Sequence, residues 1–142
     1  MEYKHIQIVN DIERIVHPRL SKNEYYIYVL ENMGKRVKVG ITHNIRNRIQ
    51  SLSGSNNGGN PFIQCAISEP TQLYSLEHLI HNHFRENRIE GTEWFQGITF
   101  EEVTDYIEEL FSSKEYERCQ EERQKYNEKQ AEAVPIEMEM EL

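Results

Sequence analysis

The stretch that decides the fold is YYIYVLENMGKRVKVGIT, residues 25–42. It contains two runs rich in aromatic and β-branched residues, 25–30 and 36–41, on either side of the turn-forming residues 32–34. Runs of this kind are typical of β-strands, and a short turn between two of them makes a β-hairpin. We therefore expect an antiparallel hairpin here.

The register of this hairpin can be predicted from its turn. A three-residue loop with Gly34 in the left-handed conformation puts Glu31 opposite Lys35, which is a favourable charge pair. The same register puts Tyr28 directly opposite Lys38. Side chains alternate between the two faces of a strand, so one face of the hairpin is apolar and the other is mixed. The apolar face carries Tyr25, Ile27, Val29, Val37, Val39 and Ile41, and the mixed face carries Tyr26, Tyr28, Lys38 and Gly40.

Working outward from the hairpin, apolar spacing predicts the other elements. Residues 5–16 have the periodicity of a short amphipathic helix. The pattern after the hairpin predicts a helix over 43–52, a flexible loop over 54–60, a third strand over 61–67 and a long helix over 71–84. The segment 91–95 breaks that helix and returns Trp94 to the body, and a capping box at 99–102 begins the last helix.

These elements predict an α/β (α+β) fold with a small three-stranded antiparallel sheet flanked by helices. Residues 1–23 form an N-terminal helical segment, residues 24–112 the main domain, and residues 113–142 an acidic tail that is helical or disordered. The tail accounts for the formal net charge of −8. Residues 1–100 carry 11 Lys and Arg against 10 Asp and Glu, whereas residues 101–142 carry 5 against 14. A nearly neutral body permits nucleic-acid binding without indicating it.

Composition also bears on location. The sequence has neither a run of about 18 apolar residues nor the apolar core of a signal peptide, so we expect a cytoplasmic protein that does not contact membranes. Cys65 and Cys119 are far apart in sequence and have no metal-ligand spacing. We expect both to be reduced thiols.

Two ionisable residues lie on otherwise apolar helix faces. Arg48 shares a face with Ile45 and Leu52, and Glu77 lies beside the buried stripe of its own helix. Burying a charge without a partner or a metal is costly. Arg48 alone is explained by a side chain that snorkels to solvent at the helix edge. A structural ion pair between Arg48 and Glu77 would explain both positions, and so would a metal-binding carboxylate beside a phosphate-binding arginine.

The histidines support a metal site only weakly. His78, His81 and His83 share a helix, but only Glu77 and His81 have the i, i+4 spacing that lets two ligands share a face. Without a cysteine partner or an HExxH motif, zinc is not favoured. His43 follows the second strand of the hairpin and is a candidate general base or phosphate contact, although a residue that starts a helix explains it too.

These residues resemble the GIY-YIG nuclease superfamily over roughly residues 24–96. The two strand motifs of the family correspond to YIY at 26–28 and KVG at 38–40, its arginine to Arg48 and its glutamate to Glu77. The sequence KVGIT at 38–42, Glu77 with His81, and EWF at 93–95 are similar to a branch common in phage and bacterial reading frames. Two positions depart from the family pattern: Tyr26 replaces a glycine, and Lys38 replaces a tyrosine that helps to activate or position water.

The resemblance implies a metal-dependent endonuclease that hydrolyses phosphodiester bonds in DNA, with DNA preferred over RNA. Glu77 would hold one Mg²⁺ or Mn²⁺, Arg48 would neutralise charge on the phosphoryl group, and Tyr28 would be the base. A base at neutral pH needs a lowered pKa, and the predicted register supplies Lys38 as the nearby cation. The catalytic set is Tyr28, Lys38, Arg48, Glu77 and His43, and the substrate-binding set is Arg36, Arg46, Arg85 and Trp94.

The two departures also leave an alternative open. A catalytically impaired module of the same fold would bind nucleic acid or a protein without cutting, through phosphate contacts that would include Lys35 and Arg88. Because little surface lies beyond the core, we expect weak sequence specificity, or specificity that comes from a homodimer or a protein partner. The acidic tail is either a solubilising segment or an inhibitory mimic of nucleic acid.

Overall fold

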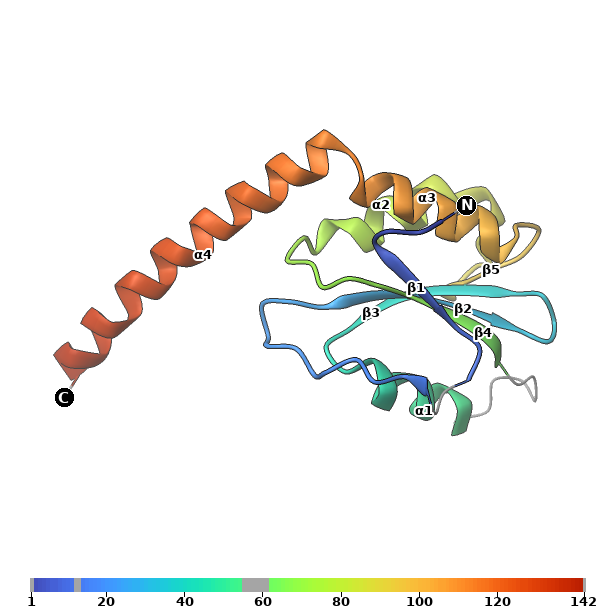
Figure 1. Ribbon diagram of the computed structural model, residues 1–142, viewed down its shortest axis with the longest axis horizontal. Coiled ribbons are helices and arrows are strands. Elements are labelled where there is room, and N and C mark those ends of the chain that lie inside the picture. The colour runs from blue at the N-terminus through green and yellow to red at the C-terminus, as the bar shows by residue number, and fades with distance from the viewer. Residues whose placement is uncertain (1, 12–13, 55–61, 142) are drawn as a thin grey trace.

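The protein contains a five-stranded antiparallel sheet in the computed structural model, which describes residues 2–11, 14–54 and 62–141 (Figure 1). The strands lie in the order β1-β4-β2-β3-β5, and each neighbouring pair is antiparallel. Their bounds are β1 Ile6–Val9, β2 Tyr26–Asn32, β3 Val37–Thr42, β4 Phe62–Ser68 and β5 Trp94–Phe95. The α+β class is therefore confirmed, but the sheet has two more strands than the sequence indicated.

The first additional strand replaces the helix predicted over residues 5–16. Ile6–Val9 pairs with the outer edge of β4, from Ile6 opposite Ser68 to Val9 opposite Cys65. The buried residues Ile6 and Val9 are three positions apart, so they lie on opposite faces of the strand and join different cores. The helical spacing of apolar residues over 5–16 did not decide the structure here, because Ile6–Val9 pairs with the open edge of β4 instead.

The predicted hairpin is present, but its register differs by one residue on each strand. Tyr28 lies opposite Gly40, and Lys38 lies opposite Leu30. The loop consists of residues 33–35, and Lys35 rather than Gly34 has the left-handed conformation, with φ of 60°. The side chain of Asn32 helps to close this loop by accepting from the backbone N–H of Arg36 at 3.1 Å. Each residue thus lies opposite a partner two positions away from the predicted one, and a shift of two positions leaves the predicted faces unchanged.

Each face of the sheet packs against its own helices (Figure 1). On one face, Ile27, Val29 and Val39 pack in a core with residues of α2 Ser75–His83 and α3 Phe100–Phe111. On the other face, Tyr28 and Leu30 pack with Ile45 and Ile49 of α1 Ile45–Gly54. Arg48 and Glu77 thus come from helices on opposite sides of the sheet, and they can meet only around its edge.

The helices predicted after the hairpin are confirmed with changed bounds. α1 begins as expected after residues 43–44, and Thr99 caps α3 by accepting from the N–H of Glu102 at 3.0 Å. The helix predicted over 71–84 is shorter, because Thr71 instead forms a two-way backbone bridge with Tyr25. A 3₁₀ turn over Arg85–Asn87 follows α2. The predicted flexible loop lies, apart from residue 54, outside the described residues.

The C-terminal segment forms one long helix, α4 Lys114–Glu141, which projects away from the body (Figure 1). Its first turns are anchored: Tyr116 is buried in the core beside α3, and its hydroxyl donates to Thr71 Oγ1 at 2.9 Å. Asn127 further along donates to Gln72 Oε1 at 3.0 Å. In the part of the chain that the structure describes, no helix combines the length and apolar character needed to cross a membrane.

Candidate active site

The candidate site lies at the outer edge of β3. β5 pairs with Val37 and Lys38 of this strand, and α2 contacts it at Val39. His81 of α2 lies 2.9 Å from the carbonyl oxygen of Val39 through its Nε2 atom. A carbonyl oxygen only accepts, so Nε2 carries a hydrogen and the orientation of the buried ring is fixed. The α2 face of the site is therefore anchored to the strand.

Tyr28 and Arg48 form the part of the site below the sheet. The Tyr28 side chain is 0% exposed and lies directly over Gly40, where an added Cβ would be 2.4 Å from the phenolic oxygen. Only glycine leaves room for the ring at this position. Arg48 donates from Nε to the Tyr28 hydroxyl at 3.2 Å. Arg48 is exposed rather than inward-facing, so its guanidinium remains accessible to a ligand.

The pKa of Tyr28 is raised, which corrects the expectation that a nearby lysine lowers it. Burial raises the pKa, the hydrogen bond and charge of Arg48 lower it, and the charges of Glu93 and Glu77 raise it. The cation that acts on the phenol is Arg48. Lys38 lies opposite Leu30 instead, because of the changed register.

Lys38 is held by two residues that follow the turn after α2. Its Nζ donates to Glu93 Oε2 at 2.8 Å and lies 5.6 Å from the centroid of the Trp94 ring. Lys38 is buried, whereas the Glu93 side chain is 41% exposed and reaches solvent. Burial raises the pKa of Glu93. The hydrogen bond and charge of Lys38, together with the charges of His81 and Arg48, lower it by more, so the net shift is downward. Glu93 is therefore an ionised partner of Lys38.

Glu77 lies on the α2 side, half-buried, with Oε1 3.6 Å from His81 Nε2. Burial raises the pKa of Glu77, and the charge of Glu93 raises it further. The charges of His81, Lys38 and Arg48 lower it, and the net shift is upward. Arg48 donates to Tyr28, and Glu77 lies 3.6 Å from His81. Arg48 and Glu77 therefore affect one another through their charges rather than as a hydrogen-bonded ion pair.

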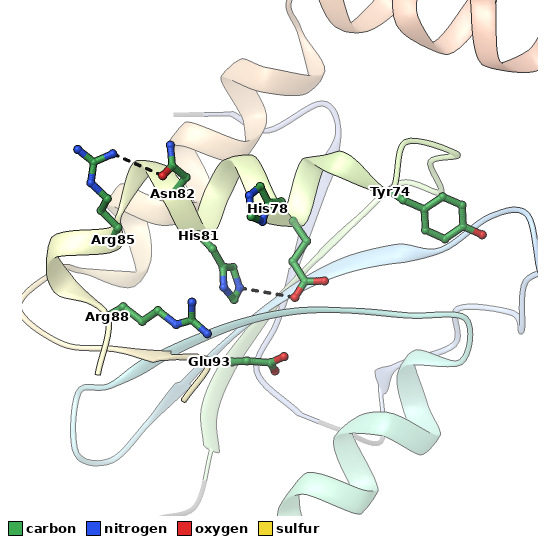
Figure 2. Close-up of a pocket in the computed structure, with 8 residues that line it drawn as sticks. Tyr74, His78, His81, Asn82, Arg85, Arg88 and Glu93 are labelled. Carbon is green, nitrogen blue, oxygen red and sulfur yellow. Dashed lines mark hydrogen bonds and ion pairs between the residues drawn. The ribbon is translucent and has the colours of Figure 1, made fainter. Parts of the chain in front are cut away.

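Glu77 and Glu93 line a polar cavity of about 440 Å³, whereas Tyr28, Lys38 and Arg48 are not among its lining residues. Figure 2 shows Arg85 and Arg88 toward one end, Tyr74 at the other, and Glu93 on the sheet side, with a dashed line from His81 marking its ion pair with Glu77. The lining residues are Tyr74, Glu77, His78, His81, Asn82, Arg85, Arg88 and Glu93. The cavity combines carboxylates with exposed guanidiniums, a chemistry suited to a metal ion and a phosphate.

The structure brings together most, but not all, of the predicted site residues. Tyr28, Lys38, Arg48 and Glu77 interact electrostatically, Arg85 lines the cavity, and Trp94 contacts Lys38. The other three predicted residues have different surroundings. His43 is bonded through Nδ1 to the carbonyl of Glu24, Arg36 is exposed beside the hairpin loop, and Arg46 is half-buried on α1.

Residues 25–111, more than half of the chain, match the sequence model of the T5orf172 domain. The chain belongs to this family. T5orf172 is a phage-associated domain of the GIY-YIG-like or HNH-like endonuclease type. The closer assignment to one GIY-YIG branch stays a prediction. No curated protein and no solved structure matched the chain.

Two residues of this T5orf172 domain were missing from the predicted site. Glu93 was noted only as part of the EWF motif, although it is the partner of Lys38. His81 was noted for its spacing from Glu77, but nothing in the sequence indicated that it anchors α2 to Val39. Both contacts depend on which segment lies along β3, which spacing within one helix does not determine.

The residues of the T5orf172 site fit a divalent ion that takes few ligands from the protein. Among the described residues, no group of three or more His, Cys, Asp and Glu side chains converges as a metal cage. Mg²⁺ binds through one or two carboxylates and keeps several waters, so it does not need such a cage. Glu77 beside the cavity, with Lys38 and Arg48 within electrostatic reach, fits this mode of binding.

Proposed function

We propose that this T5orf172 domain is a metal-dependent endonuclease that hydrolyses phosphodiester bonds in DNA. One observation carries the proposal: Glu77 and Glu93 line one polar cavity, and the charges of Lys38 and Arg48 act on both carboxylates, although Arg48 comes from the opposite side of the sheet. A purely structural ion pair would need neither the cavity nor an exposed arginine. The family match supports a nuclease-like or DNA-binding role.

In this proposal, Glu77 holds a Mg²⁺ or Mn²⁺ ion. When bound, the ion supplies Lewis-acid stabilisation of a phosphate oxygen and of the leaving oxygen. Arg48 faces the same site with an exposed guanidinium, and it neutralises charge that develops on the phosphoryl group. Lys38 adds a second positive charge, held beside the cavity by Glu93.

The raised pKa of Tyr28 changes the role that we propose for it. A phenol with a raised pKa keeps its proton at neutral pH, so it is a poor base in the resting protein. Its oxygen accepts from Arg48, and its own proton remains available to donate. We therefore expect Tyr28 to orient the attacking water or a phosphate oxygen.

Substrate contacts would come from the rim of the cavity. Arg85 and Arg88 are exposed there, on the segment that follows α2. Guanidiniums bind phosphate through paired N–H donors, and such contacts supply affinity without reading sequence. Arg85 and Arg88, together with Arg36 beside the hairpin loop and Arg46 on α1, form the proposed DNA-binding set. Trp94 is left out of this set because its ring contacts Lys38.

The test is nicking of supercoiled plasmid with Mg²⁺ or Mn²⁺ by the intact protein, Glu77→Ala and Arg48→Ala. Glu77→Ala should abolish cleavage and leave DNA binding, measured by fluorescence anisotropy, unchanged. Arg48→Ala should slow cleavage by about 10²- to 10³-fold, the usual effect of removing one donor to a developing oxyanion. Glu86→Ala, an exposed glutamate near the cavity, is the control. Equal nicking by all four proteins would refute the proposal.

A second candidate function is a DNA-binding module without turnover. The raised pKa of Tyr28 favours it, since that residue then offers no base at neutral pH. The Tyr26 departure does not bear on the choice, because its hydroxyl donates to the carbonyl of Pro18 at 2.7 Å, away from the cavity. Salt-dependent binding without a metal-dependent product would establish this second function. Duplex RNA as a parallel substrate tests the expected preference for DNA.

A further inference from the structure

Several hydrogen bonds hold the segment between α2 and β5 in a fixed turn. Thr92 accepts from Arg88 Nε at 2.6 Å and donates from Oγ1 to the carbonyl of Ile89 at 2.8 Å. The N–H of Ile89 donates to the carbonyl of Trp94 at 2.8 Å, which closes the turn around Gly91, with φ of 77°. These bonds fix the backbone on both sides of Glu93.

This fixed turn places Glu93 against Lys38. β5 pairs Trp94 with Lys38, and the neighbouring Glu93 then accepts from the ammonium at 2.8 Å while the Trp94 ring lies 5.6 Å away. A lysine side chain is long and flexible, and its order costs up to about 2 kcal/mol of rotamer entropy. A carboxylate on a rigid turn is an efficient way to keep such a side chain in one position.

Lys38 has a second anion within reach. The charge of Lys38 acts on Glu77, the carboxylate proposed to hold the metal. A buried ammonium that lost its partner would seek another, because an unpaired buried charge is costly. In the absence of Glu93, the charge of Lys38 still acts on Glu77, and an ion pair between them would compete with a divalent ion.

We propose that Glu93 is a positioning residue that holds the Lys38 ammonium beside the cavity and thereby leaves Glu77 available for the metal. The inference rests on the endonuclease function proposed above. We assign Glu93 this role because its Oε2 accepts from the Lys38 ammonium at 2.8 Å. Its role is to keep the positive charge of Lys38 in one position within the site.

The first measurement does not depend on activity. Surface lysines are acylated with a limiting amount of an activated ester, and modification of Lys38 is followed by peptide mass spectrometry. Glu93→Gln should raise the rate at Lys38 about tenfold, since the charged carboxylate that holds the Lys38 side chain through a 2.8 Å hydrogen bond is then lost. Glu90→Gln, an exposed glutamate of the same segment, should leave the rate unchanged. Near-ultraviolet circular dichroism of Trp94, the single tryptophan, checks that the turn is intact.

The second measurement is the Mg²⁺ dependence of plasmid nicking. Glu93→Gln should raise the Mg²⁺ concentration for half-maximal nicking about tenfold, because Lys38 then competes for Glu77. Adding Lys38→Met to Glu93→Gln should return that concentration to its normal value, a rescue that a merely structural role of Glu93 does not predict. Unchanged acylation of Lys38, or an unchanged Mg²⁺ requirement, would overturn the positioning role. A wild-type protein that does not nick DNA would overturn the proposed function, and the acylation result would still report whether Glu93 holds Lys38.

Discussion

Replacing Gly40 by alanine puts a methyl group against the ring of Tyr28. The added Cβ would lie 2.4 Å from the phenolic oxygen and 2.6 Å from the carbon that bears it, whereas ordinary contacts begin at 3.4 Å. The ring must therefore move by about 1 Å, and it is 0% exposed. Overpacking of this kind costs about 1–3 kcal/mol. The displaced hydroxyl also loses its 3.2 Å hydrogen bond from Arg48.

Thermal and urea unfolding measure the cost of Gly40→Ala. For a domain of this size, each kcal/mol lowers Tm by about 2–4 °C. The matched experiment repeats Gly40→Ala in a Tyr28→Leu background, where the clashing atoms are gone, and the penalty should fall by at least about 1 kcal/mol. An equal penalty in both backgrounds would show that the clash with Tyr28 is not the source of the destabilisation.

Three further predictions concern the fold and its charges. Glu108→Ala should destabilise the protein by about 2–3 kcal/mol in urea unfolding, because its buried carboxylate accepts from the backbone N–H groups of Lys4 and His5 just before β1; exposed Glu109→Ala should cost little, and equal costs would contradict this role. The pKa of Glu93 is lowered in the folded protein, so its pair with Lys38 contributes stability above the ordinary value of 4.5 that is lost as pH falls through the folded pKa. The stability difference between wild type and Glu93→Gln should accordingly shrink on acidification, and a constant difference would count against the pair. Truncation after Ser113 should lower Tm, because it removes buried Tyr116, but it should not strengthen DNA binding, because α4 projects away from the body. Tighter binding by the truncated protein would instead support an inhibitory tail.

The hairpin faces were predictable from sequence, but its register was not. Alternation along the two strands determines which side chains share a face, and that prediction is confirmed for Tyr28 and Lys38. The register depends on which loop residue takes the left-handed conformation. Glycine is favoured there, yet Lys35 takes it, with Asn32 closing the loop.

The missing strands have a common explanation. Ile6–Val9 and Trp94–Phe95 are four and two residues long, and neither has enough alternation to indicate a strand. Each is a strand only because a longer strand, β4 or β3, offers it an edge. Contacts between segments distant in sequence decide such elements, and a single sequence does not display them.

The candidate site was partly predictable for a related reason. The sequence indicated Arg48 and Glu77 as charges on apolar helix faces, and the charges of both residues act on Tyr28. Glu93 gave no such signal, since a glutamate in a polar turn is unremarkable. Its contact with Lys38 follows from the pairing of β5 with β3, the same contact that was missing from the predicted fold.

Single-turnover cleavage of an end-labelled DNA duplex tests whether the residues at the edge of β3 cut DNA. We predict that the wild-type protein cuts with Mg²⁺ or Mn²⁺ and not with chelator, and that Glu77→Gln binds the duplex but does not cut it. Exposed Glu86→Gln should cut at the wild-type rate. Cleavage by Glu77→Gln at the rate of the wild-type protein would contradict the claim that the cluster at the edge of β3 is the catalytic site.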